Sequence, residues 1–426
     1  MVLLHLPAMV QLSYSMKHDD NTRKMHIAMY IGSLQKGGAE RVMVNLAEYF
    51  HSQGHKVTLV TTYLAKEEYQ VEHAAWKVVP AGADGGTLAC DTEENPVWVD
   101  LNGGEKGGIR RVFSALLKEE QKSRAANLGL RKEKLRKIWR ELKPDIVLSF
   151  IGKNNIMALS TATREDIKVV VSVRADPYME YDSRALRAGM LATFGKAAGI
   201  VVQTTDARKF FPAYIRRKCT ILPNSVNPSF IRKRYCGERE NSIVMVGRLD
   251  ENKNQAMVME AFSEIVKEGY SDYKLKLYGD GPDRLKLQRL AVSLGIGSSI
   301  EFAGNVSHVA EHIEKASMFV LASSQEGMPN SLIEAMSLGL PCISTDCPCG
   351  GPKDLITDGV NGLLVPVKDK DAMKMAILRL IKNKELADKL SQNAIYVQEK
   401  FSPDVVNKMW EEYFESILDK KKKGKA

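Results

Sequence analysis

The chain has 426 residues, of which 44% are hydrophobic and 27% charged, and its formal net charge is +9. This composition is typical of a globular protein, and the length suits two domains because single hydrophobic cores stop growing near about 250 residues. No apolar run reaches the roughly 18 residues that a membrane-spanning helix needs, which argues against an integral membrane protein. The positive charge favours an anionic partner and leaves nucleic acid, phosphorylated metabolites and acidic lipid open.

Residues 1–24 make a poor signal peptide, because they lack a basic leading segment and because His5, Pro7 and Gln11 interrupt their apolar residues. We expect this stretch to be either a disordered leader or a stretch that is not translated in the native protein. The six cysteines follow no disulfide spacing, so we expect reduced thiols in a cytoplasmic protein.

Over residues 25–228, buried-strand patterns alternate with helical periodicity, which predicts an α/β domain. The first unit is a strand over 25–34, a loop with the glycine pair Gly37 and Gly38, and an amphipathic helix. Strand, glycine loop and helix in this order open a Rossmann-like unit. Further strands are predicted over residues 56–63, 144–150, 168–173, 199–205 and 219–226.

A long insertion interrupts this alternation. Residues 82–109 are rich in glycine and acidic residues and predict a surface excursion with one short strand at 97–101. The segment 105–143 carries thirteen lysines and arginines against five glutamates. Its apolar residues recur at helical spacing, so it predicts helices with one apolar and one strongly basic face.

The pattern lapses over residues 227–242 and then restarts, so we place a domain boundary at 228/229. A last amphipathic helix begins near residue 402 and ends in a lysine-rich tail. Its predicted apolar face is Val405, Met409, Tyr413 and Ile417. Strands are predicted over 242–249, 273–278, 299–304, 318–323, 341–346 and 362–367, and helices over 255–268, 283–294, 309–315 and 370–400.

Two cations, Arg248 and Lys253, follow the first strand of the second half. The carboxyl ends of strands in a doubly wound sheet line the ligand crevice, so both cations are predicted to reach it and to bind phosphate. A solvated pair on a charged loop would explain the same two residues. The glycine turns YGDGPD at 278–283, with Gly279 and Asp280, and SIEFAGNV at 299–306 would shape a slot for a flat base, and plain turns would explain them equally well. Gly247, at the end of the first strand of this half, is a further candidate for donor binding.

The stretch EGMPNSLIEAM, residues 326–336, enters a helix whose first N–H groups are free to bind an anion. Glu326 and Glu334 lie eight positions apart and would repel a phosphate. We therefore expect them to accept hydrogen bonds from the hydroxyls of a sugar and of a ribose on either side of the anion. The alternative is a solvent-facing Glu334 and a Glu326 that pairs with the helix dipole.

Together these motifs resemble, in the same order, those of the retaining glycosyltransferases of family 4, which have a GT-B fold of two Rossmann-like domains. The matching elements are GGAER at 37–41, VGRL at 246–249, the GDGP turn, Glu326-x7-Glu334 and the run from GLPCIST to DGVNGLLVP. The resemblance extends over about residues 25–415.

The resemblance implies a domain division and roles. The domains would be an acceptor domain at 25–228, a nucleotide-sugar donor domain at 229–400, and a final helix in 401–426 that returns to the first domain. Arg248 and Lys253 would bind the donor diphosphate, Glu326 the transferred sugar and Glu334 the ribose. Gly37, Gly38 and amides near Asn330, Ser331 and Leu332 would meet the phosphates. Fixed cations and N–H groups would stabilise the departing nucleoside diphosphate, so neither a metal nor a cofactor is expected.

The expected donor is a UDP-sugar that supplies a hexosyl or N-acetylhexosaminyl unit. The expected acceptor is a glycan or lipid-linked glycan, in polysaccharide or glycoconjugate synthesis. Arg174 and Asp176, after a first-domain strand, are candidate acceptor residues. The basic segment 105–143 would dock on an anionic membrane, at the inner face of the plasma membrane; a solvated helix face is the alternative.

The chain departs from the family at one point. Many members carry a histidine after the strand at 144–150, where this chain has the residues FIGK at 150–153. The departure fits a reaction in which the leaving phosphate itself takes the proton of the acceptor.

Other motifs point to rival functions. The sequence HVAEH at 308–312 matches an inverted zinc-protease pattern, but it is short and lies between two strands. Asp369 and Asp371 imitate a metal-binding DxD, although an N-cap explains Asp369 better. The spacing GSLQKGG is not a dinucleotide fingerprint, and the basic segment lacks the aromatic residues that stack on nucleic acid. A GT-B nucleotide-sugar epimerase and a non-catalytic GT-B partner subunit remain as alternatives.

Overall fold

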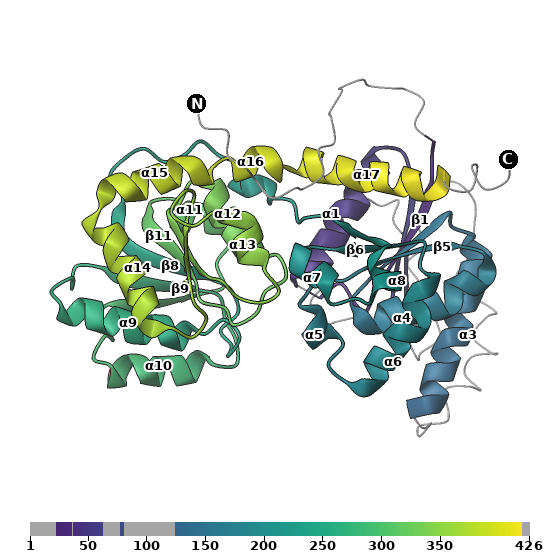
Figure 1. Cartoon of the computed structure of the whole chain (residues 1–426), viewed down its shortest axis with the longest axis horizontal. Coiled ribbons are helices and arrows are strands. Elements are labelled where there is room, and N and C mark those ends of the chain that lie inside the picture. The colour runs from purple at the N-terminus through teal and green to yellow at the C-terminus, as the bar shows by residue number, and fades with distance from the viewer. Residues whose placement is uncertain (1–22, 36, 63–76, 81–123, 420–426) are drawn as a thin grey trace, which may run out of the picture.

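The computed structural model describes residues 23–35, 37–62, 77–80 and 124–419, which form two α/β lobes side by side (Figure 1). The first lobe is built on a sheet of seven parallel strands in the order β3-β2-β1-β4-β5-β6-β7. Its strands are β1 His26–Ile31, β2 Lys56–Thr61, β3 Lys77–Pro80, β4 Ile146–Phe150, β5 Lys168–Ser172, β6 Gly199–Val202 and β7 Cys219–Ile221.

The second lobe is built on a sheet of six parallel strands in the order β10-β9-β8-β11-β12-β13. Its strands are β8 Glu240–Val246, β9 Lys274–Tyr278, β10 Ile300–Gly304, β11 Ala316–Leu321, β12 Cys342–Thr345 and β13 Leu363–Val365. Both strand orders change direction beside the strand that opens the sheet, which places a switch point for ligand binding at the carboxyl ends of the strands.

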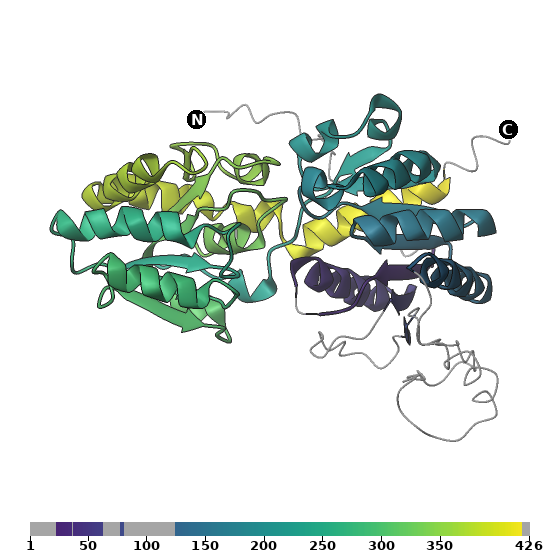
Figure 2. The same cartoon turned by 90° about the horizontal axis from the view of Figure 1, so that it is seen from below.

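Helices cover both faces of each sheet (Figure 2). Parallel strands are therefore buried on both sides, which explains why β4, with the sequence IVLSF, is mostly apolar and has every residue buried. The first lobe has α1 Gly38–Ser52, α3 Arg124–Leu142, α4 Gly152–Thr161, α5 Pro177–Glu180, α6 Arg184–Thr193, α7 Thr205–Lys209 and α8 Ala213–Arg216. The second has α9 Gln255–Lys267, α10 Arg284–Ser293, α11 Val309–Ile313, α12 Asn330–Ser337, α13 Gly351–Leu355, α14 Lys370–Lys382, α15 Lys384–Ala394 and α16 Val397–Lys400.

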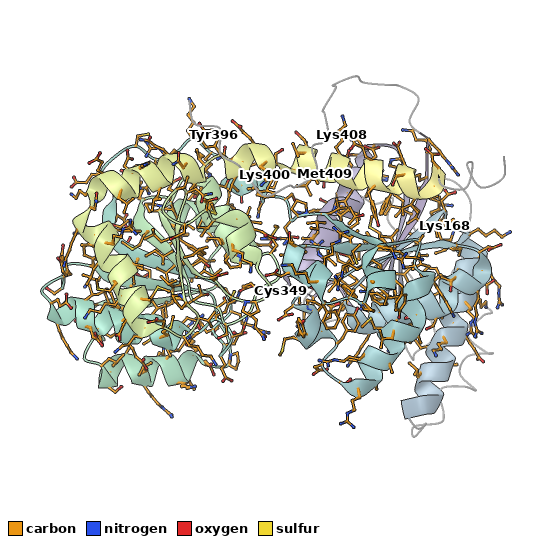
Figure 3. All side chains as sticks on the ribbon, viewed as in Figure 1. Lys168, Cys349, Tyr396, Lys400, Lys408 and Met409 are labelled. Carbon is orange, nitrogen blue, oxygen red and sulfur yellow. The ribbon has the colours of Figure 1, made fainter. Side chains whose placement is uncertain are left out.

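The last helix, α17 Pro403–Asp419, leaves the second lobe and lies along the first (Figure 1). Glu411 fastens it to α1, because its carboxylate accepts hydrogen bonds from Tyr49 Oη at 2.9 Å and lies 3.2 Å from His55 Nε2. Of the predicted apolar face, Ile417 is confirmed, whereas the other three positions are one residue out of register. The deeply buried side chains are Val406, Trp410, Phe414 and Ile417, while Met409 is only partly buried (Figure 3). The larger aromatic rings take the core positions because they bury more apolar area.

Two further predictions need correction. The single helix predicted over 370–400 is three helices, because Asn383 ends α14 and caps α15, its Oδ1 accepting the N–H of Leu386 at 2.9 Å. Strand β3 was not predicted at all. The predicted leader up to residue 22, the strand at 97–101, residues 105–123 of the basic segment and the lysine-rich tail from 420 lie outside the described residues.

Candidate active site

A cavity of about 720 Å³ lies between the two lobes, where the carboxyl ends of both sheets meet. We call it the cleft. From the first lobe it is lined by the start of α1 and by the loops after β5 and β6; from the second, by the loops after β8, β9, β10 and β11 and by the start of α12. It lies at the carboxyl ends of strands, where open parallel sheets place their ligands.

Most residues predicted from the sequence line this cleft: Gly37, Gly38, Arg174, Gly247, Arg248, Lys253, Gly279, Asp280, Glu326, Asn330, Ser331 and Glu334. Two do not. The Leu332 side chain is fully buried and its N–H donates to the Pro329 carbonyl at 3.2 Å, so this amide is already used. Asp176 caps α5 instead of facing the cleft, since its Oδ1 accepts the N–H of Tyr178 at 2.9 Å.

Lys253 and Glu326 are partners at the second-lobe wall. The Lys253 ammonium bonds to Glu326 Oε1, and the same oxygen accepts the Ser323 hydroxyl at 2.7 Å. The backbone of Glu326 is fixed on both sides: its N–H donates to the Pro348 carbonyl at 2.7 Å, and its carbonyl accepts the N–H of Cys349 at 2.9 Å. A cation and a hydroxyl acceptor therefore stand side by side on rigid backbone.

Arg248 is the most open charge of the site. Its side chain is 74% exposed, and its Nε donates to Asp250 Oδ2 at 2.6 Å. Asp250 also accepts the N–H of Lys253 at 3.0 Å, so one carboxylate arranges the loop that carries both cations. The hydrogen bond to Asp250, and not packing against other side chains, sets the orientation of the Arg248 guanidinium.

The loops after β8 and β9 touch closely. A Cβ on Gly279 would lie 2.1 Å from the Gly247 carbonyl oxygen, and the φ of Gly279 is +125°. Only glycine suits both conditions. Asp280 lines the cleft while its Oδ1 accepts the N–H of Gly281 at 2.8 Å, so its side chain serves the turn.

Two helix N-termini face one another across the cleft. Neither the Gly37 N-cap of α1 nor the Pro329 N-cap of α12 supplies a side-chain acceptor, and the first N–H groups of a helix have no intrahelical partner. A Cβ on Gly38 would lie 3.4 Å from Asn330 Nδ2, which shows how near the two ends are. Two positive dipole ends thus converge on one space, an arrangement that suits an anion.

Glu334 has a partner that the sequence did not reveal. Its Oε1 accepts a hydrogen bond from Arg41 Nη2 at 2.7 Å, although Arg41 belongs to α1 of the other lobe. Burial raises the pKa of Glu334, and the Arg41 charge opposes that rise. Arg41 belongs to the motif GGAER at 37–41, which the sequence analysis identified. The residues around it give no indication that its partner is Glu334, 293 positions away.

The first-lobe wall is formed around Arg174. Its guanidinium lies over the Phe150 ring, 4.9 Å from the centroid, and its Nη2 bonds to Asn224 Oδ1. Nε and Nη1 are buried without a hydrogen-bond partner among the described residues. Burial raises the pKa of the neighbouring Glu180 to about 8, against the opposing charge of Arg174. Asn224 and Gln203 also line the cleft and were missed by the sequence analysis.

Asn224 links the two lobes, because its Nδ2 donates to the Met328 carbonyl at 3.0 Å and to Asn330 Oδ1 at 2.7 Å. Thr204 makes a second link by donating to the Cys349 carbonyl at 2.7 Å; Cys349 lies at the junction of the lobes (Figure 3). The lobes therefore meet in specific hydrogen bonds directly behind the cleft.

The rival metal motifs find no support in the described part of the chain, where no group of three His, Cys, Asp or Glu side chains gathers. Asp369 caps α14, as predicted, with its Oδ1 accepting the N–H of Ala372 at 2.8 Å. Five of the six cysteines lie in the described residues, and all five are free thiols: Cys219, Cys236, Cys342, Cys347 and Cys349. Within the same residues, no helix is long and apolar enough to cross a bilayer.

Comparisons with known proteins agree with this geometry. The family model described as Glycosyltransferase Family 4 matches residues 36–230, and the model described as Glycosyl transferases group 1 matches residues 228–396. Among solved structures, Anabaena HepE in complex with UDP aligns with a TM-score of 0.67 and 15% identity, covering 92% of this chain and 100% of that one. The chain is a family 4-like glycosyltransferase with the GT-B fold, as the resemblance implied, and thus a transferase enzyme.

Two named relatives have similar sequences. A Campylobacter jejuni protein named GalNAc-α-(1→4)-GalNAc-α-(1→3)-diNAcBac-PP-undecaprenol α-1,4-N-acetyl-D-galactosaminyltransferase is 25% identical over 371 residues, which cover 87% of this chain and 92% of that protein. The amylovoran biosynthesis glycosyltransferase AmsD of Erwinia amylovora is 23% identical over 275 residues, 63% of this chain and 77% of that protein.

The contact between the lobes can be tested at Gly327. A Cβ there would lie 2.6 Å from Gln203 Oε1 and 2.9 Å from the Arg174 carbonyl oxygen, both in the other lobe. Gly327→Ala should push the lobes apart and lower kcat/KM by about tenfold or more, since misplacements of about 1 Å have such effects. Gly297→Ala is the control, because a Cβ there meets nothing within 4 Å. Equal kcat/KM values for the two folded variants would contradict the proposed contact.

Proposed function

We propose that the enzyme is a retaining, metal-independent glycosyltransferase that moves a hexosyl or N-acetylhexosaminyl unit from a UDP-sugar to a glycan acceptor. The observation that carries the proposal is the pairing of Lys253 with Glu326 beside two facing helix N-termini. A diphosphate fits the cation and the N–H groups, while sugar hydroxyls fit the carboxylate. HepE, whose structure was solved with UDP, supports a uridine nucleotide.

The chemistry follows from where charge develops. As the bond between the anomeric carbon and the phosphate oxygen breaks, the leaving nucleoside diphosphate gains negative charge. Lys253, Arg248 and the N–H groups of α1 and α12 are fixed around that position and stabilise the charge without reorganising. Four sources of positive potential make a metal ion unnecessary for this step.

The proton of the acceptor hydroxyl needs a destination. The loop after β4 reads FIGK and supplies no histidine. In the proposed front-face reaction, the acceptor oxygen attacks the anomeric carbon on the face that the diphosphate leaves. The departing phosphate oxygen takes the acceptor's proton, so configuration is retained and no protein base is required.

The acceptor would approach along the first-lobe wall, where the Nε and Nη1 atoms of Arg174 are buried without a hydrogen-bond partner in the part of the chain that the structure describes. The Campylobacter relative, named for an undecaprenol-diphosphate-linked acceptor, supports a lipid-linked glycan. AmsD supports a place in polysaccharide synthesis. A buried guanidinium with free donors suits either a sugar hydroxyl or an anionic group of such an acceptor.

Replacing Glu326 tests the assignment. Glu326→Ala should lower transfer at least about 100-fold, since removing one preorganised polar group at the reacting centre costs this much. The thermal midpoint should change little. The donor is first identified by thermal shift with UDP-, GDP- and ADP-sugars, because a ligand at about 100 times its Kd stabilises by roughly 2.7 kcal/mol.

Glu385→Ala, an exposed carboxylate at the start of α15, is the matched control. Near wild-type transfer by Glu326→Ala would refute the role of Glu326. Conversion of the donor in the absence of any acceptor would identify an epimerase instead. Loss of transfer upon EDTA treatment, restored by a divalent cation, would contradict metal independence.

We also propose that the first lobe docks on an anionic membrane at the cytoplasmic face. Four exposed apolar side chains, Tyr178, Met179, Leu191 and Tyr214, belong to α5, α6 and α8, which lie together in this lobe (Figure 1). Tyr214 Oη donates to the Leu191 carbonyl at 3.1 Å, which joins two of them. The same helices and the segments beside them carry exposed cations: Arg184, Arg187, Lys196, Arg208, Lys209, Arg216 and Arg217. Exposed apolar and aromatic side chains together with cations are typical of interfacial binding.

Vesicle sedimentation tests this docking. Wild type should bind vesicles with anionic lipid, and the binding should weaken at high salt because the surface attraction is screened. The double variant Tyr178→Ser with Leu191→Ser should bind about tenfold less, because two apolar side chains are lost from the interface. The control Leu285→Ser with Val292→Ser changes apolar residues that are even more exposed, on α10 of the second lobe. Salt-independent binding, or equal binding by both double variants, would contradict the proposal.

A further inference from the structure

One ion pair joins the lobes inside the cleft itself. Arg41 Nη2 and Glu334 Oε1 are 2.7 Å apart, and the side chains are only 27% and 9% exposed. Arg41 stands in the first turn of α1, where a cation is unfavourable because the dipole there is positive. The local structure therefore does not explain this residue, and the contact with the opposite lobe does.

Glu334 needs a counter-charge more than an exposed glutamate would. Burial raises its pKa, which favours the neutral acid, and Arg41 lowers it, which favours the carboxylate. The other charged groups lining the cleft stand on the loops after β5, β8, β9 and β11: Arg174, Arg248, Lys253, Asp280 and Glu326. Four of these are already in pairs of their own: Lys253 with Glu326, Arg248 with Asp250, and Asp280 with Arg284.

We propose that Arg41 is a positioning residue of the donor site: it holds Glu334 as an oriented carboxylate, ready for the ribose hydroxyls, and so makes nucleotide binding depend on the first lobe being in place. This inference rests on the proposed function, which assigns the ribose to Glu334. A carboxylate accepts hydrogen bonds from two vicinal hydroxyls, whereas the protonated acid must donate one proton and accepts less well. Arg41 thereby acts through Glu334 and not on the reacting atoms.

Protonation of Glu334 should weaken nucleotide binding. Nucleotide binding needs ionised Glu334, so affinity should fall when the pH drops below the pKa of this group. Removing Arg41 removes the opposing charge, and the pKa of Glu334 should rise further. The pH at which affinity is lost should move upward by about 1 to 3 pH units, the usual effect of one close opposite charge.

The experiment measures the affinity for UDP and, separately, for GDP by calorimetry between pH 5.5 and 8.5. Arg41→Ala should show the upward shift, whereas Arg41→Lys, which keeps the charge, should restore most of the wild-type profile. Arg289→Ala removes an exposed cation on α10 and is the control, with no shift expected. Thermal midpoints confirm that each variant is folded. A loss of affinity by the same factor at every pH would overturn the inference and make Arg41 a simple phosphate ligand.

The variant Glu334→Gln tests the ribose assignment of Glu334 separately from the positioning role of Arg41. If this variant binds nucleotide like wild type, the ribose assignment fails, and the inference on Arg41 fails with it. If Glu334→Gln weakens binding but Arg41→Ala shows no shift, only the inference fails. With Glu334→Gln already present, Arg41→Ala should add no further pH dependence, since the titrating group is gone.

Discussion

The site depends on one constraint: two uncapped helix N-termini, from separate sheets, must face the same space. Each brings the positive end of a helix dipole and the N–H groups of a first turn, and neither N-cap residue places a side-chain acceptor on those groups. The two ends are close, because a Cβ on Gly38 would be in van der Waals contact with Asn330 Nδ2, 3.4 Å away. The fixed lobe contacts through Asn224 and Thr204 then keep the two ends opposed.

Around this anion site, cations and carboxylates alternate in pairs. Lys253 stands with Glu326, Arg248 with Asp250, and Arg41 with Glu334. Pairing explains how glutamates are tolerated where two helix ends attract phosphate. Each carboxylate has a cation beside it that offsets its negative charge. The pairs place Lys253 directly beside Glu326 on the second lobe and join Arg41 to Glu334 between the lobes.

Much of this could be predicted from the sequence, because the signals were local. Buried-strand runs and glycine turns placed the β/α alternation, and the family motif placed Glu326, Glu334, Arg248 and Lys253 on one cleft. What failed depended on tertiary context. Three of the four predicted apolar positions of α17 are shifted by one residue because Trp410 and Phe414 pack against Phe150 and Phe50 of the first lobe, and periodicity alone cannot choose between adjacent stripes.

The other differences have similar causes. Asp176 caps a short helix that propensity does not mark, and the break at Asn383 depends on a dual capping role. Leu332 was one residue too far into α12 for its N–H to stay free. Arg41 has no sequence signal for its partner, because the two residues meet only when both lobes have folded and docked.

The most direct test of the account is a crystal structure with the nucleoside diphosphate of the donor bound. In that structure, phosphate oxygens should lie within hydrogen-bond distance of the Lys253 ammonium and of N–H groups at the starts of both α1 and α12. The ribose hydroxyls should donate hydrogen bonds to the Glu334 carboxylate. Phosphates bridged to the protein by a metal ion, or bound away from these two helix ends, would contradict it.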